Sequence, residues 1–460
     1  MDSETWKVVE EPSSKPAPAS GAARECDVVV IGGGPAGTTV AALLARRGRS
    51  VTLLEKGSHP RFHIGESLLP MNLPLFEKLG VLDGVRAIGV RKPAADFTGR
   101  NRHDHHTFPF ANSLGRSPDH AFQVTRSEFD ALLFDNCRSA GVLTLQEHAV
   151  KNVKPAARGW QEVQAESAPG NTVTWRCRYV VDASGQDSVL ARQQGWRQRD
   201  RRHSAAAFFA HFRGVPARDG DEAGNISIYW FDHGWVWMIP LRAGVTSVGA
   251  VCESAFAKQR RAGGDENQRE SGGGAQALLE SVLAGCPAAA ARLARAERIT
   301  PVRSAANYSY RSSRQTGPGF ALVGDAFTFI DPVFSSGVYI AMSSADALVP
   351  SIEHWLEGRR LRYRLATFGY RRRVGRGIRA FKWFIYRFNT PAMVWLFENP
   401  RNVLEVERAV VSLLAGDVYD APAIRARLLV FKALYAAVSM IQRLAPGRIS
   451  RPLPAPPEPG

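Results

Sequence analysis

The chain is short of cysteine, of long apolar runs and of acidic residues, and each shortage excludes a class of protein. Its 460 residues include five cysteines, which occur singly, so we predict no disulfide framework and no metal site, and a reduced, cytoplasmic environment. No run of 18 apolar residues occurs, and none precedes Pro12, so we expect neither a membrane span nor a secretory signal.

The acidic shortage leaves a net charge of +16, most of which lies in one stretch. Residues 358–382 hold ten Arg or Lys residues and no acid. The aromatic residues between them recur at helical spacing, and the chain has no nucleic-acid fold signature, so we predict no nucleic-acid binding. The stretch is either a solvated helix face or a docking site for an acidic partner, which would be a carrier protein or an anionic membrane surface. Residues 428–441 form either a buried helix or a helix on such a membrane surface.

Short β-branched runs alternate with helical patterns up to about residue 350, which predicts an α/β fold with a parallel sheet. Helical patterns dominate beyond that point. Residues 1–24 and 448–460, which have no periodic apolar pattern, are predicted to be a disordered leader and a loose tail. Residues 262–275 are predicted to be a surface insertion.

A dinucleotide fingerprint opens the ordered chain. In DVVVIGGGPAG (27–37) an apolar strand enters a glycine-rich turn, and a helical pattern follows at once. Gly32 allows the tight turn, Gly34 lets the backbone approach a pyrophosphate, and Gly37 permits close packing of helix on strand. A second strand, SVTLLEK, ends at Glu55, where a carboxylate would accept hydrogen bonds from a ribose diol.

A second element, about 290 residues later, favours FAD over NAD. The segment GFALVGDAFTFIDPVFSSGVYIAM (319–342) predicts a strand, then Asp325, then a helix that begins near Gly337. The carboxylate of Asp325 could hold a ribityl hydroxyl, and the helix N-terminus offers N–H groups to the flavin ring.

From Cys26 to about Ala380 the chain resembles the FAD-dependent monooxygenase-like superfamily. RSEFDALLFDNCRSAGV (126–142) is similar to the family helix whose leading arginine, here Arg126, lies by the cofactor, and VVDASGQDSVLARQQG (180–195) is similar to its second FAD motif. A surface salt bridge is the alternative role for Arg126. Within this superfamily, WVWMIP (235–240), PRFHIGESLLP (60–70) and the lysine of VRKPAADF (90–97) resemble the flavin-dependent halogenases.

The resemblance implies a para-hydroxybenzoate hydroxylase-like FAD domain and a particular chemistry. FADH2 and O2 give a C4a-hydroperoxyflavin, a bound chloride or bromide becomes hypohalous acid, and a tunnel lysine, here Lys92, delivers the halogen to an electron-rich ring. The backbone of Ser336 and Gly337 would bind the halide, and Trp235 and Trp237, which share one face of a strand, would keep organic substrate off the flavin. FADH2 would come from a separate NAD(P)H flavin reductase, since no second nucleotide fingerprint is present.

Ser335 stands where the tryptophan halogenases have a glutamate, which moves the likeness toward the branch that acts on phenols and pyrroles, either free or tethered to an acyl or peptidyl carrier protein. Glu66 is expected in the loop over the flavin, and His103, His105 and His106 in a solvated loop. The alternatives are a hydroxylase or prenyl-chain reductase of the same fold, and a non-catalytic, membrane-docked flavoprotein.

The predicted domains are a discontinuous FAD-binding domain (25–100, 120–200 and 300–350), an inserted β-sheet substrate domain (100–120 and 200–300) and a C-terminal helical region (351–447). The predicted catalytic residues are Lys92, Trp235, Trp237 and Pro240, and the predicted halide site is Ser336 with Gly337. The predicted cofactor-binding residues are Gly32, Gly34, Pro35, Ala36, Gly37, Glu55, Lys56, Arg61, Ser67, Arg126, Val150, Asp325, Pro332 and Gly337.

Overall fold

The computed structural model describes residues 23–100, 102–155, 159–262, 273–306, 309–419 and 421–444. The predicted leader, insertion and tail lie almost entirely outside these residues. Within them, no helix is long and apolar enough to cross a membrane. All five cysteines are described; each is buried, and none forms a disulfide.

The first sheet carries the glycine-rich turn. Its strand order is β19-β20-β10-β1-β2-β7, with β9 paired to β10 and β8 to β9. The neighbours of β1 and β10 run parallel to them, except β9. In β1 the run from Val28 to Ile31 is buried, as expected for a parallel strand covered on both faces. The strands are β1 (Arg24–Ile31), β2 (Val51–Leu54), β7 (Leu143–Leu145), β8 (Ala149–Pro155), β9 (Gln161–Ala168), β10 (Asn171–Asp182), β19 (Thr316–Gly317) and β20 (Phe320–Leu322).

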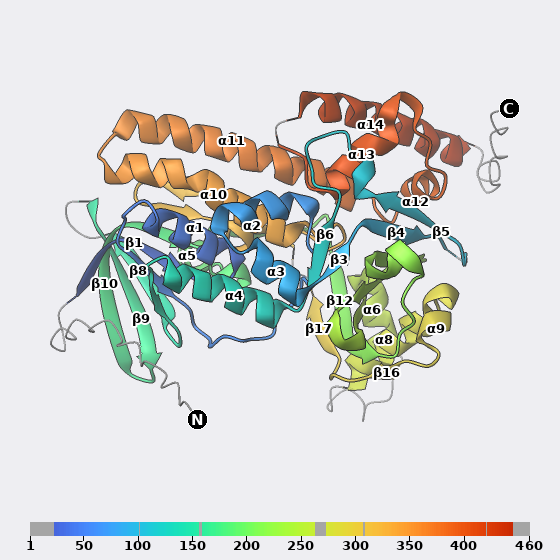
Figure 1. Ribbon diagram of the computed structural model, residues 1–460, viewed down its shortest axis with the longest axis horizontal. Helices are drawn as coiled ribbons and strands as arrows, with labels where there is room; N and C mark the ends of the chain where they lie inside the picture. Colours follow the sequence, from blue (N-terminus) through green and yellow to red (C-terminus); the bar gives the residue numbers. More distant parts are fainter. Residues whose placement is uncertain are drawn as a thin grey trace, which may run out of the picture.

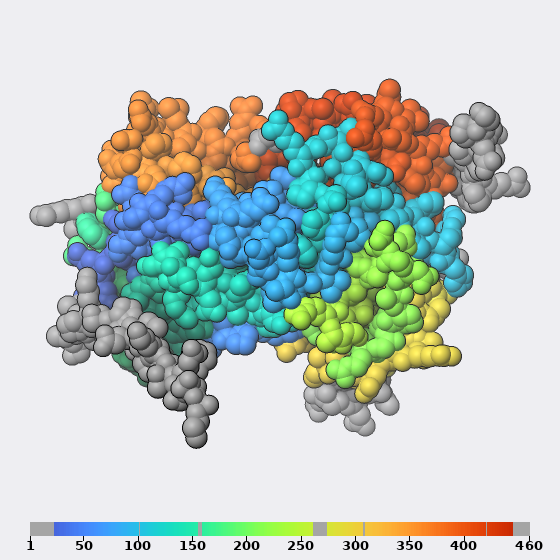
Figure 2. All heavy atoms as spheres, viewed as in Figure 1, coloured from blue at the N-terminus to red at the C-terminus, as the bar shows by residue number. Residues whose placement is uncertain are grey.

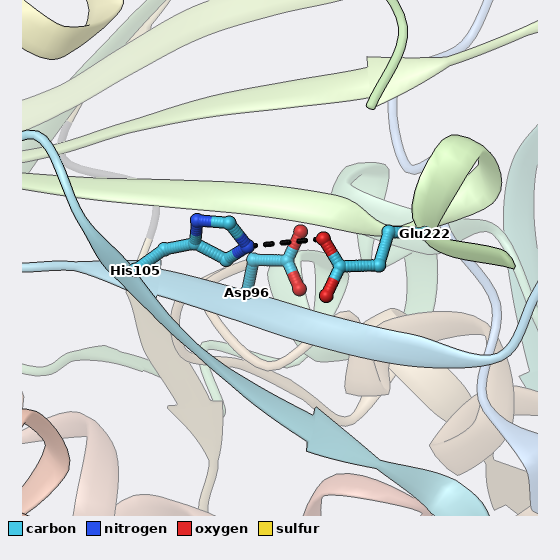
Figure 3. A group of neighbouring side chains, drawn as sticks. All are labelled: Asp96, His105 and Glu222. Carbon is cyan, nitrogen blue, oxygen red and sulfur yellow. Dashed lines mark hydrogen bonds and ion pairs between the residues drawn. The ribbon is translucent and has the colours of Figure 1, made fainter. Parts of the chain in front are cut away.

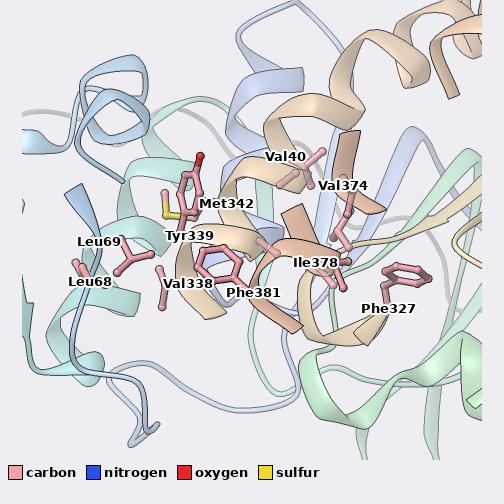
Figure 4. Packing of buried hydrophobic residues seen from close by; sticks show 14 of the residues in the cluster. Val40, Leu68, Leu69, Phe327, Val338, Tyr339, Met342, Val374, Ile378 and Phe381 are labelled. Carbon is pink, nitrogen blue, oxygen red and sulfur yellow. The ribbon is translucent and has the colours of Figure 1, made fainter. Parts of the chain in front are cut away.

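Helices cover this sheet and bring its two sequence-distant halves together. Helix α1 (Pro35–Ala45) packs against α4 (Arg126–Ser139) and against α10 (Ser336–Leu356). Figure 4 labels Val40 of α1, Val338 and Met342 of α10 and Ile378 of α11 (Arg360–Ile385), which all belong to one buried cluster. The apolar core therefore holds the first helix beside a helix that begins 300 residues later.

The second sheet forms the other half of the molecule. Its strand order is β16-β12-β15-β14-β13-β4-β5, with β17 paired to β12. All its pairs are antiparallel except β13 with β4. The strands are β4 (Ala94–Thr98), β5 (His105–Pro109), β12 (Ala205–Arg213), β13 (Ile226–Phe231), β14 (Gly234–Pro240), β15 (Val245–Glu253), β16 (Glu297–Arg298) and β17 (Arg303–Ala306). Because β4 lies in this sheet, the sheet includes residues before 100; the division of the chain into domains stays a prediction.

Successive side chains of β14 point to opposite faces of the second sheet, and the two faces pack against different parts of the protein. Trp235, Trp237 and Ile239 belong to the large core shared with the first sheet and the C-terminal helices. Val236 and Met238 belong to a separate cluster that includes residues of helix α8 (Gly273–Ala284). The two indoles therefore share a face, as the spacing predicts.

The C-terminal helices lie along one edge of the molecule (Figures 1 and 2, orange to red). They are α11, α12 (Pro391–Glu398), α13 (Val406–Leu414) and α14 (Pro422–Leu444). The remaining helices are α2 (Leu73–Leu79), α3 (Leu82–Ile88), α5 (Val189–Gln193), α6 (Ser254–Ala262), α8 (Gly273–Ala284) and α9 (Pro287–Leu293). The small strand groups are β3 (Gly89–Lys92) with β6 (Ala121–Val124), and β11 (Arg197–Arg199) with β18 (Tyr310–Ser312) and β21 (Thr328–Phe329).

Candidate flavin and halide site

A cavity of about 650 Å³ runs from the glycine-rich turn to the indoles of β14. Its walls include the carboxyl ends of β1 and β2, the beginning of α1, the loop 61–67 and the beginning of α10. This position outside the carboxyl ends of parallel strands is where open α/β sheets bind nucleotides. The volume is in the range of cofactor sites.

The glycine turn is shaped by close backbone contacts. Gly32 has φ +103°, and a Cβ there would lie 2.4 Å from the carbonyl oxygen of Ala183. A Cβ on Gly37 would lie 1.9 Å from the carbonyl oxygen of Gly32, so this glycine lets α1 pack on the turn. Gly34 differs: its Cβ would meet only Arg61, at 3.9 Å, and it faces the cavity. The turn is therefore tightly packed on the protein side, at Gly32 and Gly37, and open toward the cavity at Gly34, which suits a pyrophosphate.

Glu55 ends the second strand as a buried carboxylate on the cavity wall. It accepts hydrogen bonds from the backbone N–H of Gly33 (2.7 Å) and of Gly57 (2.9 Å), and Arg61 lies 3.4 Å away. These bonds fix the carboxylate beside the turn, where it has acceptor capacity left for a ribose diol.

Arg126 is buried and forms an ion pair within α4. Its Nε and Nη2 donate to the carboxylate of Asp130 (2.8 and 3.0 Å), and its Nη1 donates to the carbonyl oxygen of Ile64 (2.9 Å). The expected alternative, a surface salt bridge, does not describe this pair, because the two side chains are 6% and 0% exposed. Arg126 holds the loop 61–67 against the cavity.

The beginning of α10 presents unpaired groups to the same cavity. Ser335 precedes the helix in a left-handed conformation (φ +53°), and no side chain caps the first turn. A Cβ on Gly337 would meet no atom within 4 Å. Nearby, burial raises the pKa of Asp325 to about 7, and no hydrogen bond to its carboxylate is present among the described residues. Free N–H groups, open space and an unpartnered carboxyl fit a flavin ring, a ribityl chain and an anion.

Trp235 and Trp237 form the far wall of the cavity. Their ring centroids are 5.7 Å apart, and Nε1 of Trp237 donates to Oγ of Ser247 (3.2 Å). Phe209 packs against Trp237 with ring centroids 6.0 Å apart. The wall is aromatic and held in place by this hydrogen bond and the strand pairing behind it.

Lys92 lines a second, smaller cavity of about 20 Å³. Ile226, Val333 and Ser335 line both cavities, so only a thin partition separates them. The side chain of Lys92 is 2% exposed and donates to Oγ of Ser67 (2.9 Å) and to the carbonyl oxygen of Leu68 (3.1 Å). Burial without a carboxylate partner lowers its pKa from 10.5 to about 7.

Comparisons with known proteins decide the family. The family model of the FAD binding domain matches residues 25–378. The chain is 30% identical to the 1H-pyrrole-2-carbonyl-[peptidyl-carrier protein] chlorinase of Pseudomonas fluorescens over 86% of this chain and 90% of that protein. It is 34% identical to the flavin-dependent halogenase gsfI of Penicillium aethiopicum over 73% of this chain. This chain belongs to the flavin-dependent halogenase family.

A solved structure of the flavin-dependent brominase Bmp2 has the same fold, with a TM-score of 0.77 and 26% identity over 91% of this chain and all of that one. The chain covers 66% of the length of gsfI, slightly less than two thirds. The FAD-binding α/β fold and the FAD cofactor are confirmed by these matches.

The structure gathers most of the predicted site residues of this halogenase family member around the large cavity. Those on its wall are Gly32, Gly34, Pro35, Ala36, Glu55, Lys56, Arg61, Ser67, Arg126, Val150, Trp235, Trp237, Asp325, Pro332, Ser336 and Gly337. Gly37 lies behind the turn, Pro240 ends β14 away from the wall, and Lys92 lines the smaller cavity. The roles of all these residues stay proposals.

Sequence reasoning missed two carboxylate–histidine pairs beside the cavity. Nε2 of His211 lies 2.9 Å from Oε1 of Glu66, and Nε2 of His203 lies 2.7 Å from Oδ2 of Asp331. The hydrogen bond and charge of Glu66 raise the pKa of His211 above its ordinary value. Both acids line the cavity. The segment 60–70, which contains Glu66, carries the family likeness, but no pattern in the sequence points to a histidine 145 residues away.

A third group, Asp96, His105 and Glu222, lies in the second sheet (Figure 3). Nε2 of His105 lies 3.1 Å from Glu222, and Oγ1 of Thr107 lies within hydrogen-bond distance of both acids, at 3.0 Å from Asp96 and 2.9 Å from Glu222. Arg218 lies 2.8 Å from Asp96 and 3.0 Å from Nδ1 of His105, so a guanidinium already supplies the positive charge. The expectation that His105 is solvated is wrong, because pairing of β4 with β5 brings it against these groups.

Proposed function

We propose that this protein is an FADH2-dependent halogenase that acts on an electron-rich aromatic ring. The observation that carries the proposal is Lys92, a buried lysine without a carboxylate partner, placed one partition away from the cavity that fits FAD. A lysine is seldom buried without a counter-ion unless it has a task, because burial disfavours its charged form.

When bound, FADH2 supplies the electrons that reduce O2, and a chloride or bromide is thereby oxidised to hypohalous acid with release of water. The chain's own contribution begins with the halide. The uncapped N–H groups of Ser336 and Gly337 at the start of α10 would hold it, since a helix N-terminus attracts anions. The indoles of Trp235 and Trp237 close the cavity and exclude an organic ring from the flavin.

Lys92 then holds and directs the oxidant. Two of its N–H groups are bound by Ser67 and Leu68, which leaves one position of the nitrogen for the cavity. As an ammonium it donates a hydrogen bond to hypohalous acid and polarises the halogen; as a neutral amine it forms a haloamine, with loss of water. Its lowered pKa makes both forms accessible near neutral pH.

The substrate is proposed to be a phenol or a pyrrole, because these rings are activated by their own hydroxyl or nitrogen. Ser335 supports this, since it lines both cavities and offers no carboxylate to activate an indole. The chlorinase of Pseudomonas fluorescens is named for a pyrrole carried by a peptidyl carrier protein, which supports a carrier-tethered substrate here. A separate NAD(P)H flavin reductase would supply FADH2.

The test is mass spectrometry of free phenols and of phenol- and pyrrole-loaded carrier proteins after incubation with a flavin reductase, FAD, NADH and each halide in turn. A halide-dependent mass increase by one halogen minus one hydrogen supports the proposal. Halide-independent addition of oxygen would instead identify a hydroxylase of the same fold. If FAD binds but its reduced form is not reoxidised by O2, the protein is a non-catalytic flavoprotein.

A further inference from the structure

Exposed apolar side chains are concentrated on the C-terminal helices. Of the twelve large apolar residues that are exposed in the described part of the chain, ten lie between Leu361 and Leu444. Scattered single apolar residues are normal on a protein surface, but a contiguous set marks a site of contact.

Helix α14 shows the most continuous apolar surface. Its buried side, which includes Leu428, Phe431 and Val438, packs on the rest of the protein. Residues at helical spacing along its opposite side are all apolar and all exposed: Ala426, Leu429, Ala433, Ala437, Met440 and Leu444. The helix is therefore apolar on both sides, which is unusual for a helix that faces only water.

Helix α11 adds apolar residues embedded in arginines. Leu361, Leu365 and Phe368 are 70%, 64% and 66% exposed and recur at helical spacing, so they share one face. Arg362 and Arg364 flank this face on either side, and Arg371 and Arg372 continue the helix. Among the described residues, none of these four arginines has an acidic partner.

The two helices meet along one edge of the molecule. Figure 1 draws α11 and α14 along the same edge of the molecule, and Figure 2 shows this edge as the orange and red band. At their junction Phe431 of α14 stacks on Phe384 of α11, with ring centroids 5.2 Å apart. We call the exposed residues of these two helices the C-terminal helical surface. At roughly 1.5 Å per residue the helices are about 39 and 35 Å long.

We propose that the C-terminal helical surface docks on an anionic lipid bilayer, with both helices lying in the interface. Apolar side chains flanked by arginines are what an interfacial helix presents, since the apolar groups enter the acyl boundary while the cations stay at the headgroups. Anionic headgroups also supply the negative charge that the unpaired arginines lack. A second copy of the chain would instead bring two arginine-rich helices together. This proposal does not depend on the halogenase activity.

The test measures partition of the full chain, with FAD bound, onto vesicles. Wild-type protein is expected to co-sediment with vesicles of phosphatidylglycerol and phosphatidylcholine at low salt, and far less with phosphatidylcholine alone or at high salt. Leu429→Glu places a charge in the apolar line of α14 and should lower the partition coefficient about tenfold. The matched control is Leu143→Glu, which adds the same charge at an exposed leucine of β7 and should leave binding unchanged.

Two triple variants distinguish the effect of positive charge on the C-terminal helical surface from the effect of the net charge of the whole protein. Arg364→Gln/Arg371→Gln/Arg372→Gln should weaken binding to anionic vesicles about tenfold and flatten its salt dependence. Arg47→Gln/Arg201→Gln/Arg242→Gln removes the same charge elsewhere and should have little effect. The proposal is overturned if wild-type protein binds no vesicles, if the control sets lose binding as the surface variants do, or if light scattering shows a lipid-independent dimer that Leu429→Glu dissociates.

Discussion

Replacement of Lys92 by methionine tests both the proposed chemistry and the electrostatics of its cavity. Methionine keeps the unbranched, apolar side chain as far as Cε and lacks only Nζ, which lies 5.2 Å from the ring centroid of Phe110. It removes the only group that we propose to bind the oxidant. We expect Lys92→Met to bind FAD and to reoxidise FADH2 with O2, but to yield no halogenated product.

The magnitude follows from the pKa of the buried amine. A fall in pKa from 10.5 to about 7 corresponds to about 5 kcal/mol of free energy lost when the ammonium is buried. Between these two pH values the unfolded chain binds more protons than the folded chain, so this group makes the free energy of unfolding rise with pH. Lys92→Met should therefore stabilise the protein most at pH 7 and below. The gain should be about 2 kcal/mol smaller at pH 9 and vanish near pH 10.5.

Two measurements check this reasoning. The first is the ratio of halogenated product to FADH2 consumed, by mass spectrometry and stopped-flow absorbance. The second is urea unfolding of wild type and of Lys92→Met at pH 7 and pH 9, with Lys78→Met, at an exposed lysine, as the matched control. If Lys92→Met gives halogenated product at the wild-type yield, the proposed role of Lys92 is refuted. If Lys92→Met raises the free energy of unfolding equally at pH 7 and pH 9, the proposed burial of Lys92 as a charged group is refuted.

Four further predictions concern the walls of the two cavities. Gly337→Leu should weaken FAD binding at least about tenfold in a fluorescence titration, since its side chain would occupy open cavity space. Asp325→Asn should abolish the rise of FAD affinity that we expect as pH increases through about 7, where the carboxyl becomes a stronger acceptor; equal pH profiles would contradict this. Arg126→Met should lower the free energy of unfolding by up to about 3–5 kcal/mol, because buried Asp130 then keeps only its longer ion pair with Arg61 (3.8 Å), and Arg126→Met/Asp130→Leu should recover most of this loss. Phe97→Ala should lower the free energy of unfolding by about 3–5 kcal/mol, because it leaves a cavity in the core. It should also widen the substrate range toward bulkier phenols, which mass spectrometry of the products would show.

The sequence predicted the parts of the site that depend on local backbone. The turn at Gly32, the acid at the end of β2 and the helix start at Gly337 each follow from a strand or helix boundary, and each lies at the cavity. The shared face of the two indoles follows from strand alternation alone. Gly37 and Pro240 belong to the same motifs as the cavity residues, but the structure places both away from the cavity wall.

The remaining features depend on contacts between distant segments, for which a single sequence carries no pattern. His211 meets Glu66 only because β12, whose Ala207 and Phe209 line the cavity, lies beside the loop 61–67. His105 meets Arg218 and Glu222 only because β5 pairs with β4 and β4 with β13. The composition of residues 428–441 fits a buried helix and a helix on a membrane surface equally well, and only the exposure of Leu429 and Met440 reveals the apolar outer face of α14.

The sizes of the two cavities constrain how the proposed reaction would be organised. The cavity at Lys92 measures about 20 Å³, enough for about one water-sized molecule, whereas the flavin cavity measures about 650 Å³. Hypohalous acid is small enough to cross the partition at Ser335, and an aromatic ring is not. The ring must therefore approach Lys92 from the opposite side, where Phe97 of β4 and Leu414 of α13 close the small cavity. Because these side chains are fully packed, admitting a substrate requires them to move apart, which ties substrate entry to the position of the C-terminal helices.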